Sequence, residues 1–190
     1  MDTKDGIEYY LADSLEISED GLTYKIHLDE DANWSDGEPV TVQDILFSFN
    51  YAGRSSGGKS SYNTINGKPV QFNEIDEKTL EITLPEPYAS YVTTLSNRVL
   101  VMPSHAFDND PSKVDDSGYF NEIDMATSGA YTVSEINDDS IVYVARDDYY
   151  RGDPSVKKIV LRNTGSGSSR QVAFENGEIS YMRVTNKRGI

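Results

Sequence analysis

The chain has 190 residues, of which 37% are hydrophobic and 11% aromatic, enough to bury the core of one domain or of one domain and part of another. Its formal net charge of −15 argues against partners that need a basic surface, namely nucleic acids and anionic membrane surfaces. The chain contains no cysteine, which excludes a disulfide framework, and no apolar run reaches the length of a membrane span.

The first predicted element is a β-hairpin over residues 11–28. Apolar and polar residues alternate through Leu15 and Ile17 and again through Leu22–Leu28, which is the pattern of half-buried strands. Ser18–Gly21 separates the two runs and supplies turn residues, with Gly21 free to take a positive φ.

A helix is predicted after the Trp-Ser-Asp-Gly sequence at 34–37. Thr41 and Asp44 have the spacing of a capping box, in which Thr41 caps the helix and Asp44 answers three residues later. We interpret Trp34 as an anchored side chain and 34–37 as a tight turn that leads into this cap. The helix is expected to bury the apolar residues spaced i, i+3, i+4 and i+7, which are Val42, Ile45, Leu46 and Phe49.

A second hairpin is predicted from Val70–Ile75 and Thr79–Leu84, joined by a turn at Asp76–Lys78 and ended by Pro85. Up to residue 124 the pattern then indicates a short helix, an apolar run and a polar loop, at Tyr88–Ser96, Val99–Met102 and Asp108–Tyr119. From Thr127 it indicates a third hairpin, a further strand, and a helix that ends at Asn176-Gly177 in the left-handed conformation. These last elements span Tyr131–Ile136 with Ile141–Ala145, Val156–Leu161 and Arg170–Glu175.

One stretch, Gly53–Ser60, matches the letters of a phosphate-binding P-loop. A P-loop leaves a strand and opens a helix, whereas this stretch follows a predicted helix and precedes residues without helical periodicity. We therefore predict a plain loop over Gly53–Ser61.

The sequence offers no strong metal or catalytic pattern. Four residues have the spacing of the first oxygen ligands in a calcium-binding EF-hand loop. The loop also needs glycine at its sixth position and glutamate at its twelfth, and Trp34 and Val40 stand there, so the coordination shell of the calcium cannot close. A calcium bound at the surface remains an alternative. The four residues are Asp29, Asp31, Asn33 and Ser35. Two separated histidines, His27 and His105, make no zinc site. We predict no catalytic residue, no metal and no cofactor, hence a protein that is not an enzyme.

Four ordered motifs resemble the extracellular solute-binding proteins of ABC transporters, family 5, and its oligopeptide-binding branch in particular. The hairpin, turn and capped helix of 11–50 come first, and Thr127–Val133 (TSGAYTV) is similar to the family's TGPYKV or NGAYKL. Arg146–Gly152 (RDDYYRG) resembles RNPDYWGG, with Tyr-Tyr in place of Tyr-Trp, and Gln171–Ile179 (QVAFENGEI) resembles ALQSGEID.

The resemblance implies an α+β fold with mixed sheets and short helices, part of a two-lobed periplasmic-binding-protein-like architecture (class II, cluster C). Residues 1–124 would form the small inserted subdomain of the first lobe. Residues 125–190 would form part of its main subdomain, ending near the crossover to a second lobe that is absent. The opening residues show neither a secretory signal nor a lipid-anchor cysteine, so we expect an excised piece of a longer protein, with a naturally short protein as the alternative.

The resemblance also implies a function. The intact protein would capture oligopeptides outside the membrane, in the periplasm or as a cell-surface lipoprotein, and deliver them to an ABC permease. The segment after Gly-Glu-Ile would cross the ligand cleft, and Tyr62 would border it. The expected ligand-facing residues are Tyr62, Tyr181, Met182, Arg183, Val184 and Thr185, although strand-core or solvated roles are the alternative for the last five.

Other solutes stay open as alternatives, namely nickel, a sugar or an opine. So does another class of function, a standalone adhesion or signalling module derived from a binding-protein lobe. Because a half-site lacks enclosure, we expect weak or no peptide affinity for these 190 residues alone. An open sheet edge in the later part of the chain would also favour dimerisation.

Overall fold

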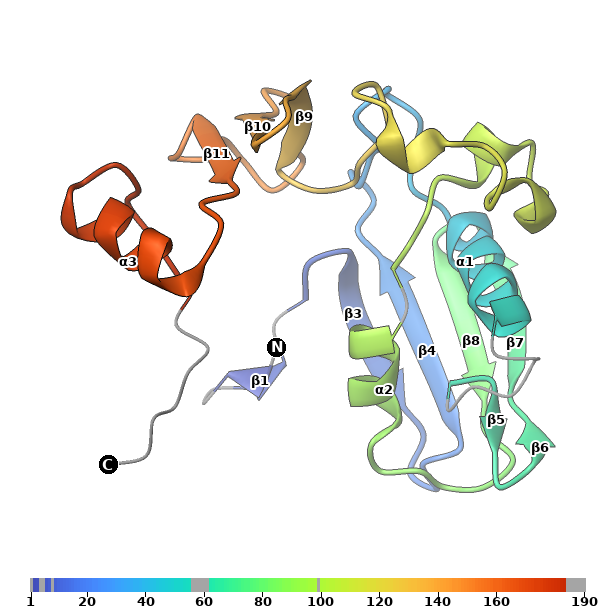
Figure 1. Ribbon diagram of the computed structural model, residues 1–190. Coiled ribbons are helices and arrows are strands. Elements are labelled where there is room, and N and C mark those ends of the chain that lie inside the picture. The colour runs from blue at the N-terminus through green and yellow to red at the C-terminus, as the bar shows by residue number, and fades with distance from the viewer. Residues whose placement is uncertain (1, 4–5, 8, 56–61, 99, 184–190) are drawn as a thin grey trace, which may run out of the picture.

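A four-stranded antiparallel sheet forms the centre of the chain's first part (Figure 1). The computed structural model describes residues 2–3, 6–7, 9–55, 62–98 and 100–183. The sheet has the order β3-β4-β8-β7, and two helices, α1 and α2, pack against one of its faces. The bounds are β3 Ala12–Ile17, β4 Thr23–Leu28, β7 Gln71–Asp76, β8 Thr79–Thr83, α1 Val42–Ser55 and α2 Tyr91–Arg98.

The alternation of side chains explains this arrangement and confirms both predicted hairpins. Leu80 and Ile82 of β8 are fully buried beneath the helices, whereas Glu81 between them lies opposite Lys25 of β4 on the other, polar face. Only the apolar face therefore needs a cover. The core beneath α1 and α2 includes two ring contacts, Tyr24 with Tyr91 at 5.4 Å and Phe49 with Phe72 at 4.7 Å between centroids.

Helix α1 buries more of its surface than its apolar spacing predicted. Val42, Ile45 and Phe49 are buried as expected, whereas Leu46 is only partly buried against the same core. A second side of the helix, with Asp44, Phe47 and Ser48, is also buried, because the chain after Met102 folds over it. This cover consists of the 3-10 turns η1 Ser104–Phe107 and η2 Pro111–Lys113, and the second of them lies in 108–119, where the sequence had predicted loop.

The later part of the chain contains a second antiparallel sheet, ordered β11-β10-β9. Its strands are β9 Tyr131–Ile136, β10 Ser140–Ala145 and β11 Lys158–Arg162, close to the predicted bounds. Helix α3, Gly167–Glu175, begins three residues before the predicted start because Ser166 accepts a bond from the Ser169 N–H and caps it. Gly177 takes the expected positive φ of 75°.

Some small elements and boundaries were not predicted. β5 Thr64–Ile65 pairs with β6 Lys68–Pro69 through Asn66-Gly67, whose φ angles of 48° and 79° suit a tight hairpin. β1 Asp2–Thr3 pairs with β2 Gly6–Ile7, and η3 spans Tyr119–Asn121. Helix α2 begins at Tyr91, not at Tyr88, because residues 88–91 form a turn closed by a 3.0 Å bond.

Residues 56–61 and 99 lie outside the described part of the chain, so most of the predicted loop over Gly53–Ser61 is untested. Its first residues, up to Ser55, belong to α1. Within the described residues, none of the helices combines the length and the apolar character that crossing a bilayer would require.

Truncation of the central strand should weaken the fold strongly. Leu80→Ala removes a side chain with no exposed surface, and we expect the free energy of unfolding to fall by about 2–5 kcal/mol. Urea denaturation followed by the fluorescence of the single tryptophan measures it. Gln71→Ala on the exposed edge strand is the control, with an expected change within about 0.5 kcal/mol; equal losses would contradict this assignment of the core.

Candidate functional site

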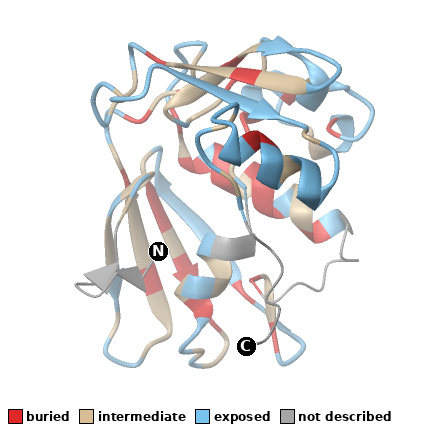
Figure 2. Ribbon diagram, turned by 60° about the vertical axis from the view of Figure 1, so that its left-hand side comes forward, coloured by how far each residue is buried: buried red, intermediate tan, exposed pale blue. Residues whose placement is uncertain are grey.

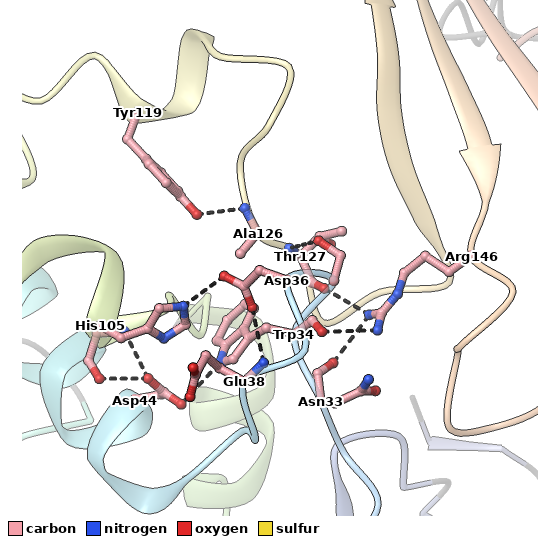
Figure 3. A network of polar contacts seen from close by, with 12 residues as sticks. Asn33, Trp34, Asp36, Glu38, Asp44, His105, Tyr119, Ala126, Thr127 and Arg146 are labelled. Carbon is pink, nitrogen blue, oxygen red and sulfur yellow. Dashed lines mark hydrogen bonds and ion pairs between the residues drawn. The ribbon is translucent and has the colours of Figure 1, made fainter.

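The turn at 34–37 lies at the centre of a polar network that joins the two parts of the chain (Figure 3). The Trp34 N–H donates to the Glu38 carbonyl at 2.8 Å, and the Gly37 N–H donates to the Trp34 carbonyl at 3.0 Å. Gly37 has φ of 94°, which a residue with a Cβ adopts only under strain. The Asp36 carboxylate accepts from the Glu38 N–H at 3.2 Å and thereby tightens the turn.

Asp44, at the start of α1, is a buried carboxylate whose oxygens both accept hydrogen bonds. One oxygen accepts from the Trp34 indole at 3.1 Å and from the Thr41 N–H at 3.0 Å. The other accepts from the N–H and the hydroxyl of Ser104, at 2.8 and 2.7 Å. These bonds offset the cost of burying the carboxylate. They confirm the prediction that Trp34 is anchored at the helix cap.

The predicted capping box forms only in part. The half that involves the Asp44 side chain forms as expected, because its carboxylate accepts from the Thr41 N–H. The reciprocal bond is absent from the described residues: the Asp44 N–H donates to the Thr41 carbonyl at 3.1 Å, and the Thr41 hydroxyl lies 3.5 Å from the Asp44 carboxylate. The Asp44 carboxylate also accepts from Trp34 and Ser104, so it is the main acceptor at the start of the helix.

Arg146, at the end of β10, binds both parts of the chain. Its side chain is 2% exposed and forms a forked contact with Asp148, from Nε at 3.0 Å and from Nη2 at 2.9 Å. The remaining N–H groups donate to backbone carbonyls, which Figure 3 shows in part. These carbonyls are those of Asn33 at 3.2 Å, Trp34 at 3.2 Å, Thr127 at 2.9 Å and Gly129 at 3.3 Å.

Further bonds close the same junction. Ser35 and Thr127 are joined twice, by the Ser35 N–H to the Thr127 carbonyl at 3.0 Å and by the Thr127 N–H to the Ser35 hydroxyl at 3.1 Å. Just before this point in the chain, the Ala126 N–H donates to the Tyr119 hydroxyl oxygen at 2.6 Å. His105 Nε2 lies 2.8 Å from the Asp36 carboxylate.

The hydrogen bonds of this junction run between the Trp34 turn, the segment before β9 and the end of β10, and most of them are partly buried. Together they hold backbone and side chains in fixed positions.

This network is suited to structural support, because its donors and acceptors are already paired with one another. Within the described residues, one buried side-chain atom of the junction has no hydrogen-bond partner, the Oδ1 of Asn33. The four residues with the spacing of calcium ligands form hydrogen bonds with different partners. Asp29 accepts from the Asp31 N–H at 3.0 Å, and Asn33 donates to Asp148 at 3.2 Å. Ser35 bonds to Thr127 as described above.

Sequence reasoning did not foresee the role of Arg146. It lies in a motif that carried the family resemblance, but no position in the sequence shows that its guanidinium faces the Trp34 turn, 112 residues away along the chain. The spacing of Arg146 and Asp148 was the available signal, because residues two apart in an extended segment point to the same side. Ser104 and its bond to Asp44 carry no sequence signal.

Tyr62, one of the predicted ligand-facing residues, lies in the core. Its side chain is 3% exposed and its ring stacks on Phe49 with centroids 5.4 Å apart. Its hydroxyl donates to the Phe49 carbonyl at 3.3 Å, and its own carbonyl accepts from the Tyr91 hydroxyl at 2.7 Å. The burial gives Tyr62 a packing role, and its place beside a ligand stays a prediction.

The other predicted residues follow α3. Tyr181 is 82% exposed, Met182 is half-buried and Arg183 is exposed, whereas Val184 and Thr185 lie outside the described residues. Figure 1 shows α3, which precedes Tyr181, on the opposite side of the molecule from β5, which follows Tyr62. Whether Tyr62 and 181–183 face one ligand stays a prediction.

Two pKa values reflect the geometry near Arg146. The Arg146 guanidinium donates to Asp148 and thereby holds the pKa of that carboxyl below its ordinary value. Burial raises the pKa of Tyr150 to about 12, and the Tyr150 hydroxyl donates to the Tyr10 carbonyl at 2.7 Å. Arg151 lies over the Tyr10 ring at 4.9 Å, so the motif after β10 also fixes the segment that leads into β3.

Comparison with known proteins gives a consistent result. The family described as bacterial extracellular solute-binding proteins, family 5 Middle, matches residues 6–188. A putative ABC transporter peptide-binding protein of Brucella ovis is 31% identical over 175 residues, which cover 92% of this chain and 33% of the relative. The chain thus spans about a third of the length of such curated relatives.

Solved structures agree with the fold. A putative peptide binding protein, AppA from Clostridium difficile, has a TM-score of 0.76 at 31% identity, over 90% of this chain and 35% of that one. MoaA from A. tumefaciens R10, in complex with mannopinic acid, has a TM-score of 0.72 at 28% identity, over 92% and 34%. These likenesses confirm the predicted mixed fold of sheets and short helices.

Removal of the Arg146 guanidinium should destabilise the junction. Arg146→Met leaves the buried carbonyls without donors, and we expect the free energy of unfolding to fall by about 3–5 kcal/mol. Arg146→Lys should recover only part of the loss, because an ammonium cannot reproduce the planar fork. Urea denaturation measures both, with Arg151→Met as the control at a more exposed arginine. A loss at Arg151 as large as that at Arg146 would contradict the assignment.

The ion pair of Arg146 and Asp148 should make stability depend on pH. Because folding lowers the pKa of Asp148, the pair stabilises the folded chain above the pKa of an unfolded aspartate, about 4, and the contribution is lost as the pH falls through the lower, folded pKa. The difference in unfolding free energy between the unmodified chain and Asp148→Asn should be constant above about pH 5 and shrink below about pH 4. Urea denaturation across this range checks it.

The control for this pH experiment is Asp116→Asn, which removes an exposed carboxylate outside the junction. A difference for Asp148→Asn that grows as the pH falls would have the wrong sign and would contradict the prediction.

Proposed function

Because the chain belongs to family 5 of the bacterial extracellular solute-binding proteins, as its motifs predicted, we propose that it is part of a protein that captures oligopeptides outside the membrane and delivers them to an ABC permease. The match over residues 6–188 is the observation that carries the proposal. The Brucella ovis relative and the Clostridium difficile structure, both named as peptide-binding, support peptides as the solute. Their names describe binding proteins, which supports a binding role over a catalytic one.

The proposed location is outside the cytoplasm, in the periplasm or at the cell surface through a lipid anchor. The family's description as extracellular supports this location. In the proposed organisation, residues 1–124 are the small subdomain and 125–190 part of the main subdomain of one lobe. The separation of the strands into one sheet within 12–83 and another within 131–162 supports this division.

The segment after α3 is the proposed point of contact with a peptide. Tyr181 and Arg183 are exposed, and the described residues offer no hydrogen-bond partner to their backbone groups. Backbone groups without an internal partner can pair with the main chain of a peptide, as an added strand pairs with a sheet edge. A second lobe closing on a hinge would cover the other side of the peptide.

The junction around Arg146 would serve this function by keeping the two sheets in a constant relative position. It ties the Trp34 turn to the end of β10, so the two sheets keep one relative position while a ligand binds elsewhere. Main-chain recognition makes few demands on peptide side chains, which favours binding of varied sequences.

A titration followed by NMR tests the proposal. We expect the backbone amide signals of 181–183 in the ¹⁵N-labelled chain to shift as trialanine is added up to about 10 mM, with weak, millimolar affinity because only half of the site is present. Tyr181→Ala should reduce the response, whereas Tyr10→Ala, at an exposed tyrosine of another segment, should not.

The same titration with nickel-histidine and with mannopinic acid examines the rival solutes. A stronger response at 181–183 to either of them than to trialanine would contradict peptides as the preferred ligand. Micromolar binding of trialanine would contradict the view that this chain holds only half of a site.

A further inference from the structure

In four places, the described part of the chain has asparagine or aspartate directly before a glycine. They are Asp20-Gly21, Asp36-Gly37, Asn66-Gly67 and Asn176-Gly177. In such a pair the backbone nitrogen of the glycine can attack the side-chain carbonyl carbon of the residue before it, and glycine has no Cβ that obstructs the approach. Asparagine is the more labile of the two residue types, because its side-chain nitrogen can leave as ammonia. The attack requires that the glycine nitrogen can turn toward the side chain.

Three of the four glycine nitrogens are held by a hydrogen bond to the carbonyl three residues earlier. These bonds run from Gly21 to Ser18 at 2.8 Å, from Gly37 to Trp34 at 3.0 Å and from Gly177 to Phe174 at 3.0 Å. Each bond fixes the peptide plane of the glycine, so the nitrogen approaches the preceding side chain only after the turn opens. The N–H of Gly67 has no such acceptor among the described residues.

Exposure and space do not distinguish the two asparagine pairs. Asn66-Gly67 and Asn176-Gly177 are exposed, and α3, which leads into Asn176, is exposed along most of its length (Figure 2). A Cβ on Gly67 or on Gly177 would meet no atom within 4 Å. Both glycines also have a positive φ, of 79° and 75°. The hydrogen bonds are therefore the feature in which the two pairs differ.

The backbone around Asn176 is held by several bonds at once. Besides the bond of Gly177, the Asn176 N–H donates to the Val172 carbonyl and the Glu178 N–H donates to the Ala173 carbonyl, both at 2.9 Å. Three consecutive N–H groups thus close the end of α3, and a rotation of the backbone at Asn176 has to break them together.

The turn at Asn66 is held by fewer contacts. Strands β5 and β6 are two residues long, and a hairpin of this size opens at a small cost in free energy. The side-chain amide of Asn66 donates to the Glu86 carboxylate, which also lies 3.6 Å from the Lys68 ammonium. The side chains of Lys68 and Glu86 are 63% and 34% exposed, so these contacts compete with water and are weak.

We propose that Asn66 is a site of spontaneous deamidation in the folded chain, and that the bonds at the end of α3 protect Asn176. A bond forms between the Gly67 nitrogen and Cγ of Asn66, and the bond from Cγ to the side-chain nitrogen breaks. That nitrogen leaves as ammonia and carries away the proton of the Gly67 N–H. Water then opens the resulting succinimide ring at either of its carbonyls. The product at position 66 is aspartate, or isoaspartate in which the main chain runs through Cγ.

The reaction would change the whole hairpin. The amide of Asn66 now donates to Glu86, and in its place a new carboxylate would face the Glu86 carboxylate and be repelled by it. Isoaspartate also adds a main-chain atom inside a two-residue turn, which disturbs the pairing of Ile65 with Lys68. Ile65 is 7% exposed and belongs to the core beneath the helices, so the change reaches the packed interior. This inference does not depend on which solute the protein binds.

Deamidation of both asparagines can be measured in one sample. The purified chain is incubated for several weeks in mildly alkaline buffer, and peptide mapping by mass spectrometry follows the conversion of each asparagine. We expect conversion at Asn66 to be at least about tenfold faster than at Asn176 in the folded chain. In a denaturing concentration of guanidinium chloride both sites lose their structure, and the two rates should agree within about threefold.

Equal rates at Asn66 and Asn176 in the folded chain would overturn the proposal. So would a ratio of the two rates that denaturation leaves unchanged, because the local sequence and not the fold would then set it.

The substitution Asn66→Asp tests the effect on the hairpin, because it introduces the charge of one product. We expect amide hydrogen exchange at Ile65 and Lys68 to become at least about threefold faster. Asn109→Asp is the matched control, since Asn109 is another exposed asparagine with a positive φ, of 58°, and should leave the exchange at these two amides unchanged. Unaltered exchange in the Asn66→Asp chain would contradict the predicted effect.

Discussion

The guanidinium of Arg146 is the interaction on which the arrangement of the two sheets depends. It is almost completely buried, and it donates to carbonyls that come from both sides of the junction, those of Trp34 and Thr127 among them. A buried cation is costly unless its charge and its donors are matched, and here Asp148 supplies the charge and the carbonyls accept the remaining donors. A planar fork of five N–H groups is the side chain that can meet this geometry.

Trp34 connects this junction to the start of α1. Its carbonyl accepts from Arg146, while its indole donates to Asp44 at the start of α1. Asp44 in turn holds Ser104, at the first of the turns that cover the second side of the helix. The bonds form a continuous chain from the end of β10 to α1. A change in the relative position of the two sheets would therefore have to break bonds of this chain.

The sequence was informative where a pattern is local. Alternation located the three hairpins, and the spacing from Val42 to Phe49 located α1 and its main buried face. It was uninformative where the partners or the burial of a side chain depend on segments that are distant along the chain. Asp44 reads as a cap residue, but the structure adds Trp34 and Ser104 as partners, and the burial of Tyr62 follows from packing against Phe49. The hairpin at Asn66-Gly67 had a recognisable turn signal that strands of two residues made easy to overlook.

The partners of Arg146 across the junction are backbone oxygens, and this has a consequence for how such proteins diverge. A carbonyl is present whatever side chain its residue carries, so the contacts of Arg146 with the Asn33 and Trp34 carbonyls do not depend on the side chains at these two positions. Evolution can then vary the surface of either part without redesigning the contact between them. The Arg146 contact thus constrains the path of the backbone at 33–34 more than the choice of side chain there.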